Sequence, residues 1–296
     1  MRGSFLLLAT ALGASFLRVG ISQADPVLPM CSKATDTDCF TGKLGLVHIP
    51  PVEEDKDQAL EYDFGFVDSS GTGWQTNSGD PTNGASIPKA LRWIVGQPFD
   101  PLFVPASVIH DRYCDMIRSR RVYPWKATHR MFYEALLATG VSPSKARLMY
   151  YAVYSFGPRW TPAEIDAGHV CRGNLTPFCQ QIIGESGATV SSSDPEPAVA
   201  ENPAELKKKY EITRGPDGKF DVYRKAIYDQ PDVDGDMHAV RTILDATFSG
   251  PDAEKSSPEQ QMELIENLSD TRHPAEVILL NEKVPNPKSK VTKSPK

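Results

Sequence analysis

The sequence predicts an α+β fold in which a small antiparallel sheet precedes a helical core with a long antiparallel helix pair, followed by a partly disordered C-terminal extension. Three observations predict it. Residues 59–67 alternate apolar and acidic side chains, as a half-buried strand does. Residues 105–158 hold three stretches with apolar side chains at helical spacing. From about residue 185 the chain becomes rich in Ser, Pro and Glu, a composition that cannot bury a core.

The N-terminus has the pattern of a secretory signal. Arg2 precedes the apolar run FLLLATALGASFL, and the small residues Ser22 and Ala24 predict cleavage before Asp25. We therefore expect a secreted or periplasmic protein. No later stretch is apolar enough for a transmembrane segment, so none is expected after signal cleavage.

The net charge argues against a nucleic-acid partner. The formal charge of the whole chain is −6, and removal of Arg2 and Arg18 with the signal makes it −8. An acidic protein is not steered to nucleic acid by its overall field.

Composition divides the chain into five parts. They are a signal peptide (1–24), an α+β globular domain (25–184), a disordered linker (185–205), a small helical domain or extension (206–282) and a disordered basic tail (283–296). The C-terminal extension is a candidate surface for a protein partner.

The β part is expected to form one short sheet. Residues 43–49 read as a strand that ends at two prolines, and 59–67 as a strand with Leu60, Tyr62, Phe64 and Phe66 on one face. Residues 74–77 can pair back as a hairpin after a glycine-containing turn.

Four helices are expected next. They span residues 87–96, 105–121, 124–140 and 142–158, with proline near each start and glycine at several ends. The last of them is apolar nearly all round, which predicts a central place in the core.

The cysteines indicate disulfides. Cys31, Cys39, Cys171 and Cys179 allow two local loops or two long-range cross-links, and spacing does not choose among the three connectivities. Cys114 lies on the apolar side of its helix and is predicted to be a buried free thiol.

His110 and Asp111 are the first candidates for chemistry. Adjacent helical residues point about 100° apart, so the pair can address two atoms of one site as a general base and a metal ligand. His129 lies on the apolar stripe of the next helix, and the two imidazoles could face each other if the helices pack as an antiparallel pair. The alternative is that both histidines are hydrogen-bonded core residues.

The loop GDPTNGASIP, residues 79–88, is the second candidate. Asn83-Gly84 favours a tight turn that can present several backbone carbonyls in one direction. Such carbonyls and the Asp111 carboxylate are suitable ligands for Ca²⁺. A water held by His110 could then attack an ester whose carbonyl the cation polarises. Alternatively, the loop only connects a hairpin to a helix.

Three motifs carry a resemblance. TNGASIP, PASVIHDRYC and THRMFYEALLATGVSPSKARLMYYAVYSFG occur in that order. Residues 43–160 thereby resemble a family of phage and bacterial proteins of unknown function, with the pattern T-D-G-A-S-I-P, a helix containing H-D, and then A-D-x-x-F. The resemblance implies no established activity.

A more distant similarity is to the secreted phospholipase A₂ enzymes of bacteria and fungi. It implies that His110 is the general base and that Asp111 binds calcium with carbonyls around Asn83 and Gly84. Two residues depart from the pattern. Asn83 replaces an aspartate, which weakens a Ca²⁺ site. His129 stands where an aspartate orients the base, and a histidine cannot stabilise an imidazolium as a carboxylate does. The chemistry has then shifted, for example to a His/His/Asp metal site, or the activity is lost.

Two classes of function follow. The first is an exported, metal-dependent hydrolase of esters, with lipids as the expected substrates and His110 beside an open cleft. The second is a non-catalytic secreted or cell-envelope module in which His110, Asp111 and His129 seal one another by hydrogen bonds. A phosphohydrolase of the HD type needs further helical ligands, and His48 lies on a predicted strand instead.

Overall fold

The computed structural model describes residues 27–48, 58–82, 100–114, 121–160, 210–214, 220–250 and 256–273. Several predictions fall outside these residues. They are the signal peptide, the helix at 87–96, the linker at 185–205, the tail at 283–296, and Asn83, Gly84, Cys171 and Cys179.

The described part is α+β, as predicted. Its strands are β1 (Cys39–Gly42), β2 (Leu46–His48), β3 (Gln58–Leu60), β4 (Phe64–Val67), β5 (Gly73–Thr76), β6 (Pro81–Thr82), β7 (Arg159–Trp160), β8 (Tyr210–Arg214) and β9 (Phe220–Arg224). Its helices are α2 (Val104–Tyr113), α3 (Trp125–Ala138), α4 (Pro143–Phe156), α8 (Val233–Thr247) and α9 (Pro258–Arg272). All strand pairs are antiparallel.

The prediction of one continuous strand over 59–67 is wrong. β3 belongs to the sheet β2-β3-β6, whereas β4 belongs to the sheet β1-β4-β5. The chain bends between them because its polar groups bind the turn before β6: Asp63 Oδ1 accepts from the Ser78 N–H at 2.8 Å, and the Glu61 carbonyl accepts from Ser78 Oγ at 2.9 Å. Tyr62, expected on the buried face, is 39% exposed.

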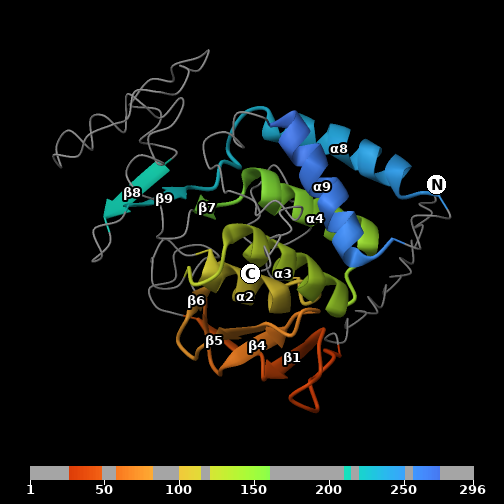
Figure 1. Cartoon of the computed structure of the whole chain (residues 1–296). Helices are drawn as coiled ribbons and strands as arrows, with labels where there is room; N and C mark the ends of the chain where they lie inside the picture. Colours follow the sequence, from red (N-terminus) through yellow and green to blue (C-terminus); the bar gives the residue numbers. More distant parts are fainter. Residues whose placement is uncertain are drawn as a thin grey trace, which may run out of the picture.

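The single predicted sheet is accordingly replaced by three small sheets in the described residues. In β1-β4-β5, Phe66 pairs with Phe40 on one side and Trp74 on the other, so aromatic cross-strand pairs cover one face. The third sheet, β7-β9-β8, lies at one end of the helices (Figure 1).

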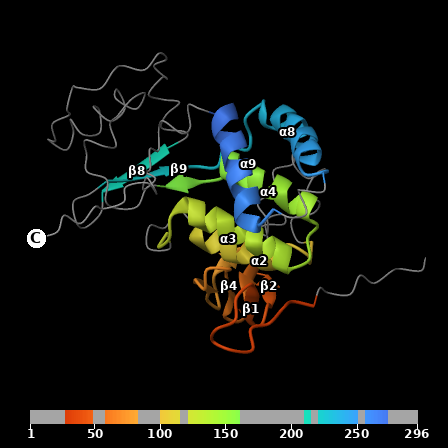
Figure 2. The ribbon, with the colours of Figure 1, turned by 45° about the vertical axis from the view of Figure 1, so that its right-hand side comes forward.

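The helices form layers on the first sheet. Figures 1 and 2 show α2 above β4 and β5, then α3 and α4, and finally α8 and α9 on the far side of α4. Residues 139–142 join α3 to α4 as a short turn, with Gly140 at a positive φ of 86°, a conformation that suits a helix end. A short connection of this kind makes the two helices antiparallel neighbours.

α4 is buried along most of its length, as its apolar composition predicts. From Leu148 to Phe156 every residue is buried, because α3 packs on one side and α8 and α9 cover the other. The C-terminal helices thus share one core with the N-terminal elements: Val240 and Ile265 are both fully buried within it.

The disulfide in the described residues is local. Cys31 and Cys39 are bonded to each other, and Cys39 is the first residue of β1. Cys114 is a free thiol that is half-buried rather than fully buried. Among the described residues, no helix combines the length and apolar character needed to cross a membrane.

Candidate functional site

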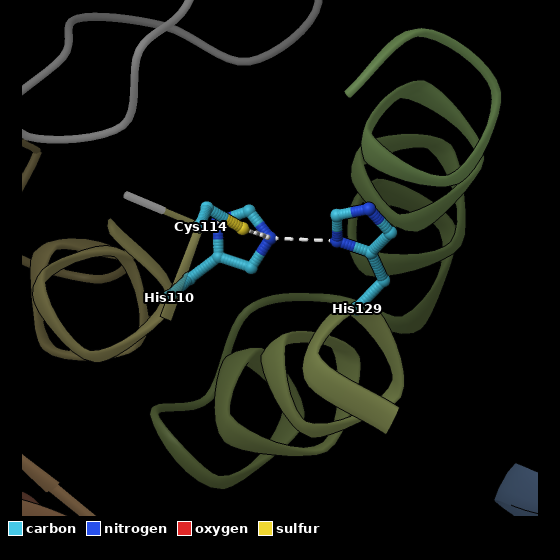
Figure 3. Close-up of side chains that lie close together, drawn as sticks. All are labelled: His110, Cys114 and His129. Atoms are coloured by element: carbon cyan, nitrogen blue, oxygen red, sulfur yellow. Dashed lines mark hydrogen bonds between the residues drawn. The ribbon is translucent and has the colours of Figure 1, made fainter. Parts of the chain in front are cut away.

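Two histidines meet where α2 packs against α3. His110 Nε2 lies 2.8 Å from His129 Nδ1, within hydrogen-bond distance. Figure 3 shows the two rings pointing toward each other from neighbouring helices, with Cys114 beside His110. The sequence places them there because α2 and α3 each turn an apolar stripe to the other, and each stripe carries one histidine.

The hydrogen-bond partners determine where the protons lie. His129 Nε2 is 3.0 Å from the carbonyl oxygen of Pro158, which can only accept, so His129 carries its proton on Nε2. Its Nδ1 therefore accepts, and His110 must donate from Nε2. A neutral His110 then has its lone pair on Nδ1, which lies 3.8 Å from Cys114 Sγ.

The environment of the pair keeps both rings neutral. His110 is 6% exposed and His129 is fully buried. Burial lowers the pKa of His110 to about 3. Burial also holds the pKa of His129 well below its usual range, and the nearby charges of Arg159 and Arg224 lower it further.

Cys114 joins the pair from the end of α2. Its Sγ lies 3.3 Å from His110 Nε2, because residues four apart share a helix face. Burial, followed by the charge of Asp111, raises the pKa of the thiol well above its usual value, so Cys114 is protonated at neutral pH. Tyr223 donates to the Cys114 carbonyl at 2.8 Å and fixes the helix end.

Asp111 contacts a different part of the chain than His110 does. Its Oδ2 accepts from Thr82 Oγ1 at 2.8 Å, and Thr82 immediately precedes Asn83 and Gly84. The next residue, Arg112, forms a salt bridge of 2.5 Å with Asp80. Both contacts tie this edge of α2 to the start of the predicted loop.

The predicted site residues are thus partly brought together. His110 and His129 are in contact, and Asp111 is hydrogen-bonded to Thr82 near the start of the predicted loop. Asn83 and Gly84 themselves lie outside the described residues. His48 lies on β2, as expected, and is exposed.

Two members of the site were not predicted as such: Cys114 was expected only as a buried free thiol, and Pro158 was not considered. Cys114 stands four residues after His110, and that spacing alone predicts a shared helix face. Pro158, the acceptor for His129, lies beyond the end of α4 and carries no sequence signal for this contact.

The fold and site thus define an α+β protein with a buried His/Cys/His cluster in which one donor atom from each residue lies within 4.8 Å of the others. Residues 58–153 match the model of a family described as "Protein of unknown function (DUF1353)". The matched segment runs from β3 into α4 and includes His110, Asp111, Cys114 and His129. The expected similarity to a family of unknown function is confirmed.

Two relatives come from Sinorhizobium fredii (strain NBRC 101917 / NGR234). The chain is 46% identical over 160 residues to the uncharacterized protein y4iH, covering 54% of this chain and 63% of that protein. It is 43% identical over 102 residues to the uncharacterized protein y4jT, covering 34% of this chain and 29% of that protein. The chain therefore spans less than two thirds of the length of either relative. No solved structure matches the chain.

Proposed function

We propose that this protein is an exported, metal-dependent hydrolase of ester bonds, with lipid esters as the substrate class. In this proposal His110 is the general base, His129 orients it, and Asp111 binds Ca²⁺ together with carbonyls of Asn83 and Gly84. The observation that carries the proposal is the directed hydrogen-bond chain from His110 through His129 to Pro158.

The chain supports a base because it fixes one tautomer. A general base needs a lone pair at a defined atom, and the chain leaves that lone pair on His110 Nδ1. Burial lowers the pKa of His110 to about 3, so the ring is neutral at pH 7 and Nδ1 carries a lone pair. Burial makes the ring a weak base, and its neutral partner does not stabilise the imidazolium, so we expect slow turnover.

The oxygen donors beside His110 suit a hard cation. The Asp111 carboxylate and the Thr82 hydroxyl lie 2.8 Å apart at the start of the predicted loop. Calcium prefers such ligands. When bound there, Ca²⁺ would polarise the ester carbonyl and stabilise charge on its oxygen. The chain's own residues hold the attacking water and accept its proton.

Export is supported by two observations. The Cys31–Cys39 disulfide is typical of oxidising compartments, and residues 1–24 have the pattern of a signal that directs secretion.

The test is release of fatty acid from phospholipid vesicles by residues 25–296, with Ca²⁺ or with chelator. We expect Ca²⁺-dependent release that is lost in His110→Ala and kept in His238→Ala, a histidine on α8 whose side chain is 57% exposed. Absence of release in both conditions by the folded protein would contradict the proposal.

A second candidate is a non-catalytic secreted or cell-envelope module that binds a protein partner through its C-terminal extension. The near-complete burial of His110 and His129, and their mutual hydrogen bond, favour it. It predicts no ester hydrolysis and a His110→Ala phenotype confined to stability.

A further inference from the structure

We propose that His110, Cys114 and His129 form a binding site for a thiophilic divalent cation, Zn²⁺ or Co²⁺, separate from the oxygen donors of Asp111. The ligand atoms are His110 Nε2, Cys114 Sγ and His129 Nδ1. One donor atom from each residue lies within 4.8 Å of the others.

The distances are close to those of a coordinated set. His110 Nε2 is 2.8 Å from His129 Nδ1 and 3.3 Å from Cys114 Sγ. A tetrahedral ion with Zn–N near 2.0 Å and Zn–S near 2.3 Å separates its ligands by roughly 3.3 Å (N to N) and 3.6 Å (N to S). The two nitrogens must therefore separate by about half an ångström, and Cys114 Sγ and His129 Nδ1, which lie within 4.8 Å, must reach a similar spacing.

The donor types select the metal. Two imidazoles and a thiolate suit Zn²⁺ and Co²⁺ and are poor ligands for Ca²⁺, which takes oxygen. The carboxylate of Asp111 is engaged by Thr82, away from this cluster. Two neighbouring sites of different chemistry thus arise from adjacent residues of one helix.

The surroundings already orient one ligand for coordination. The Nε2–H of His129 donates to the Pro158 carbonyl, which leaves Nδ1 directed at the cluster. A second hydrogen bond of this kind fixes the ring of most histidines that bind metals. Cys114 is half-buried as a residue and is the last described residue at this end of α2.

Binding changes the protons as follows. The Cys114 thiol releases its proton to solvent, and bonds form from the ion to Sγ and to both nitrogens. The proton on His110 Nε2 is replaced by the ion and moves to Nδ1. Three protein ligands leave the fourth tetrahedral position for a water.

This exchange has a consequence that rests on the proposed function. With its proton on Nδ1, His110 no longer offers a lone pair to a substrate water. One equivalent of Zn²⁺ would therefore inhibit Ca²⁺-dependent hydrolysis. Metal binding itself does not depend on that activity.

The experiment is titration of the disulfide-intact protein, residues 25–296, with Co²⁺, followed by ultraviolet and visible absorption. We expect one equivalent of Co²⁺ to give a thiolate-to-metal charge-transfer band, and Zn²⁺ to abolish it by displacement. Cys114→Ser, which keeps the side-chain size, should lose the band, and His129→Asn should weaken Co²⁺ binding at least about 100-fold.

Two controls separate this site from others in the chain. His238→Ala should bind Co²⁺ like the wild type. A Cys171→Ser, Cys179→Ser double variant should keep the band, because the proposal assigns the thiolate ligand to Cys114 alone. If Cys114→Ser does not fold by circular dichroism, the loss in His129→Asn carries the test.

A wild-type protein without the band, or a band that persists in folded Cys114→Ser, would overturn the proposal. The Co²⁺ result is read without any hydrolysis assay. Co²⁺ binding without fatty-acid release would thus support this site while contradicting the proposed function.

Discussion

His129 keeps the geometry of an orienting carboxylate while lacking its charge. Its Nδ1 is bonded to Cγ, as is an oxygen of aspartate, so an aspartate at 129 can place an oxygen at the same point beside His110 Nε2. Arg159 and Arg224 lie close enough for their charges to lower the pKa of His129. The same positive charges would stabilise an anion at this position.

We therefore predict that His129→Asp raises the rate of Ca²⁺-dependent ester hydrolysis by about tenfold or more, because a carboxylate stabilises the imidazolium of His110. The measurement is kcat and KM with phospholipid vesicles. His129→Asn, which has an oxygen in the same place but no charge, is the matched control and should give no gain. Equal rates in the two variants would show that charge at 129 does not limit the reaction.

The buried histidines also predict a loss of stability in mild acid. The folded-state pKa of His110, about 3, is below the unfolded value of about 6.5. The unfolded state thus binds the proton more readily. The stabilisation is complete above pH 6.5 and falls as pH decreases toward 3, by about 1.4 kcal/mol per pH unit for each such group. His129 acts in the same direction.

Urea denaturation at several values between pH 7 and pH 4.5 measures this loss. His110→Gln removes one titrating group and should give a shallower decrease of unfolding free energy with falling pH. A slope that is unchanged in His110→Gln would mean that other groups control acid stability.

For single residues, the sequence predicted which side chains form the site better than it predicted their hydrogen-bond partners. The histidines at helical spacing predicted that two rings could face each other, and the structure places them in contact. The proton assignment depends on Pro158, 29 residues from His129 along the chain. No local sequence pattern predicts a contact between His129 and a residue that follows α4.

Among the elements, α9 is held to the core by an ion pair in which Glu266 is buried and Arg130 is partly exposed. Glu266 accepts from Arg130 Nε at 2.6 Å and Nη2 at 2.9 Å, and from the Tyr150 hydroxyl at 2.6 Å. This arrangement links α9 to both α3 and α4. It also gives the buried Tyr150 hydroxyl a hydrogen-bond acceptor.

Glu266→Ala should lower the free energy of unfolding by about 3 kcal/mol, at the lower end for a broken buried pair, because water can still reach Arg130. The Arg130 side chain is 36% exposed. Chemical denaturation measures the change. Glu263→Ala, exposed on the same helix, is the matched control and should change stability by less than about 0.5 kcal/mol. Equal losses in both variants would contradict a specific role for the pair.

The bounds of the helices were predicted more accurately than those of the strands, for a physical reason. The spacing of apolar residues within α3 and α4 directly reflects burial against neighbours, so both helices were found close to their observed bounds. The alternation through residues 59–67 continues across a bend, where the exposed Asp63 accepts a hydrogen bond from the Ser78 N–H. Alternation shows which side chains are polar, and it does not show what they bind.

For the whole molecule, the central place of α4 makes the N-terminal and C-terminal parts interdependent. Its apolar surface on all sides predicted a buried helix, but the sequence does not show which elements cover it. The cover comes from six buried residues of α8 and α9: Val233, Met237, Val240, Leu244, Met262 and Ile265. β9 adds a strand beside β7, next to the Pro158 carbonyl that orients His129.

We predict that residues 25–184 do not form a stable domain alone. Burial of each large aliphatic side chain contributes about 1.5–3 kcal/mol, so removal of the six costs about 10 kcal/mol or more, comparable to the whole stability of a typical domain. Truncation also exposes the matching face of α4.

The measurement compares residues 25–184 with residues 25–273 by urea denaturation and limited proteolysis. The longer protein should unfold cooperatively, and the shorter should bind hydrophobic dye and be digested rapidly. A cooperative transition of residues 25–184 at the same urea concentration would show that α8 and α9 do not contribute to the stability of the core. In that case the orientation of His129 would have to be independent of β9.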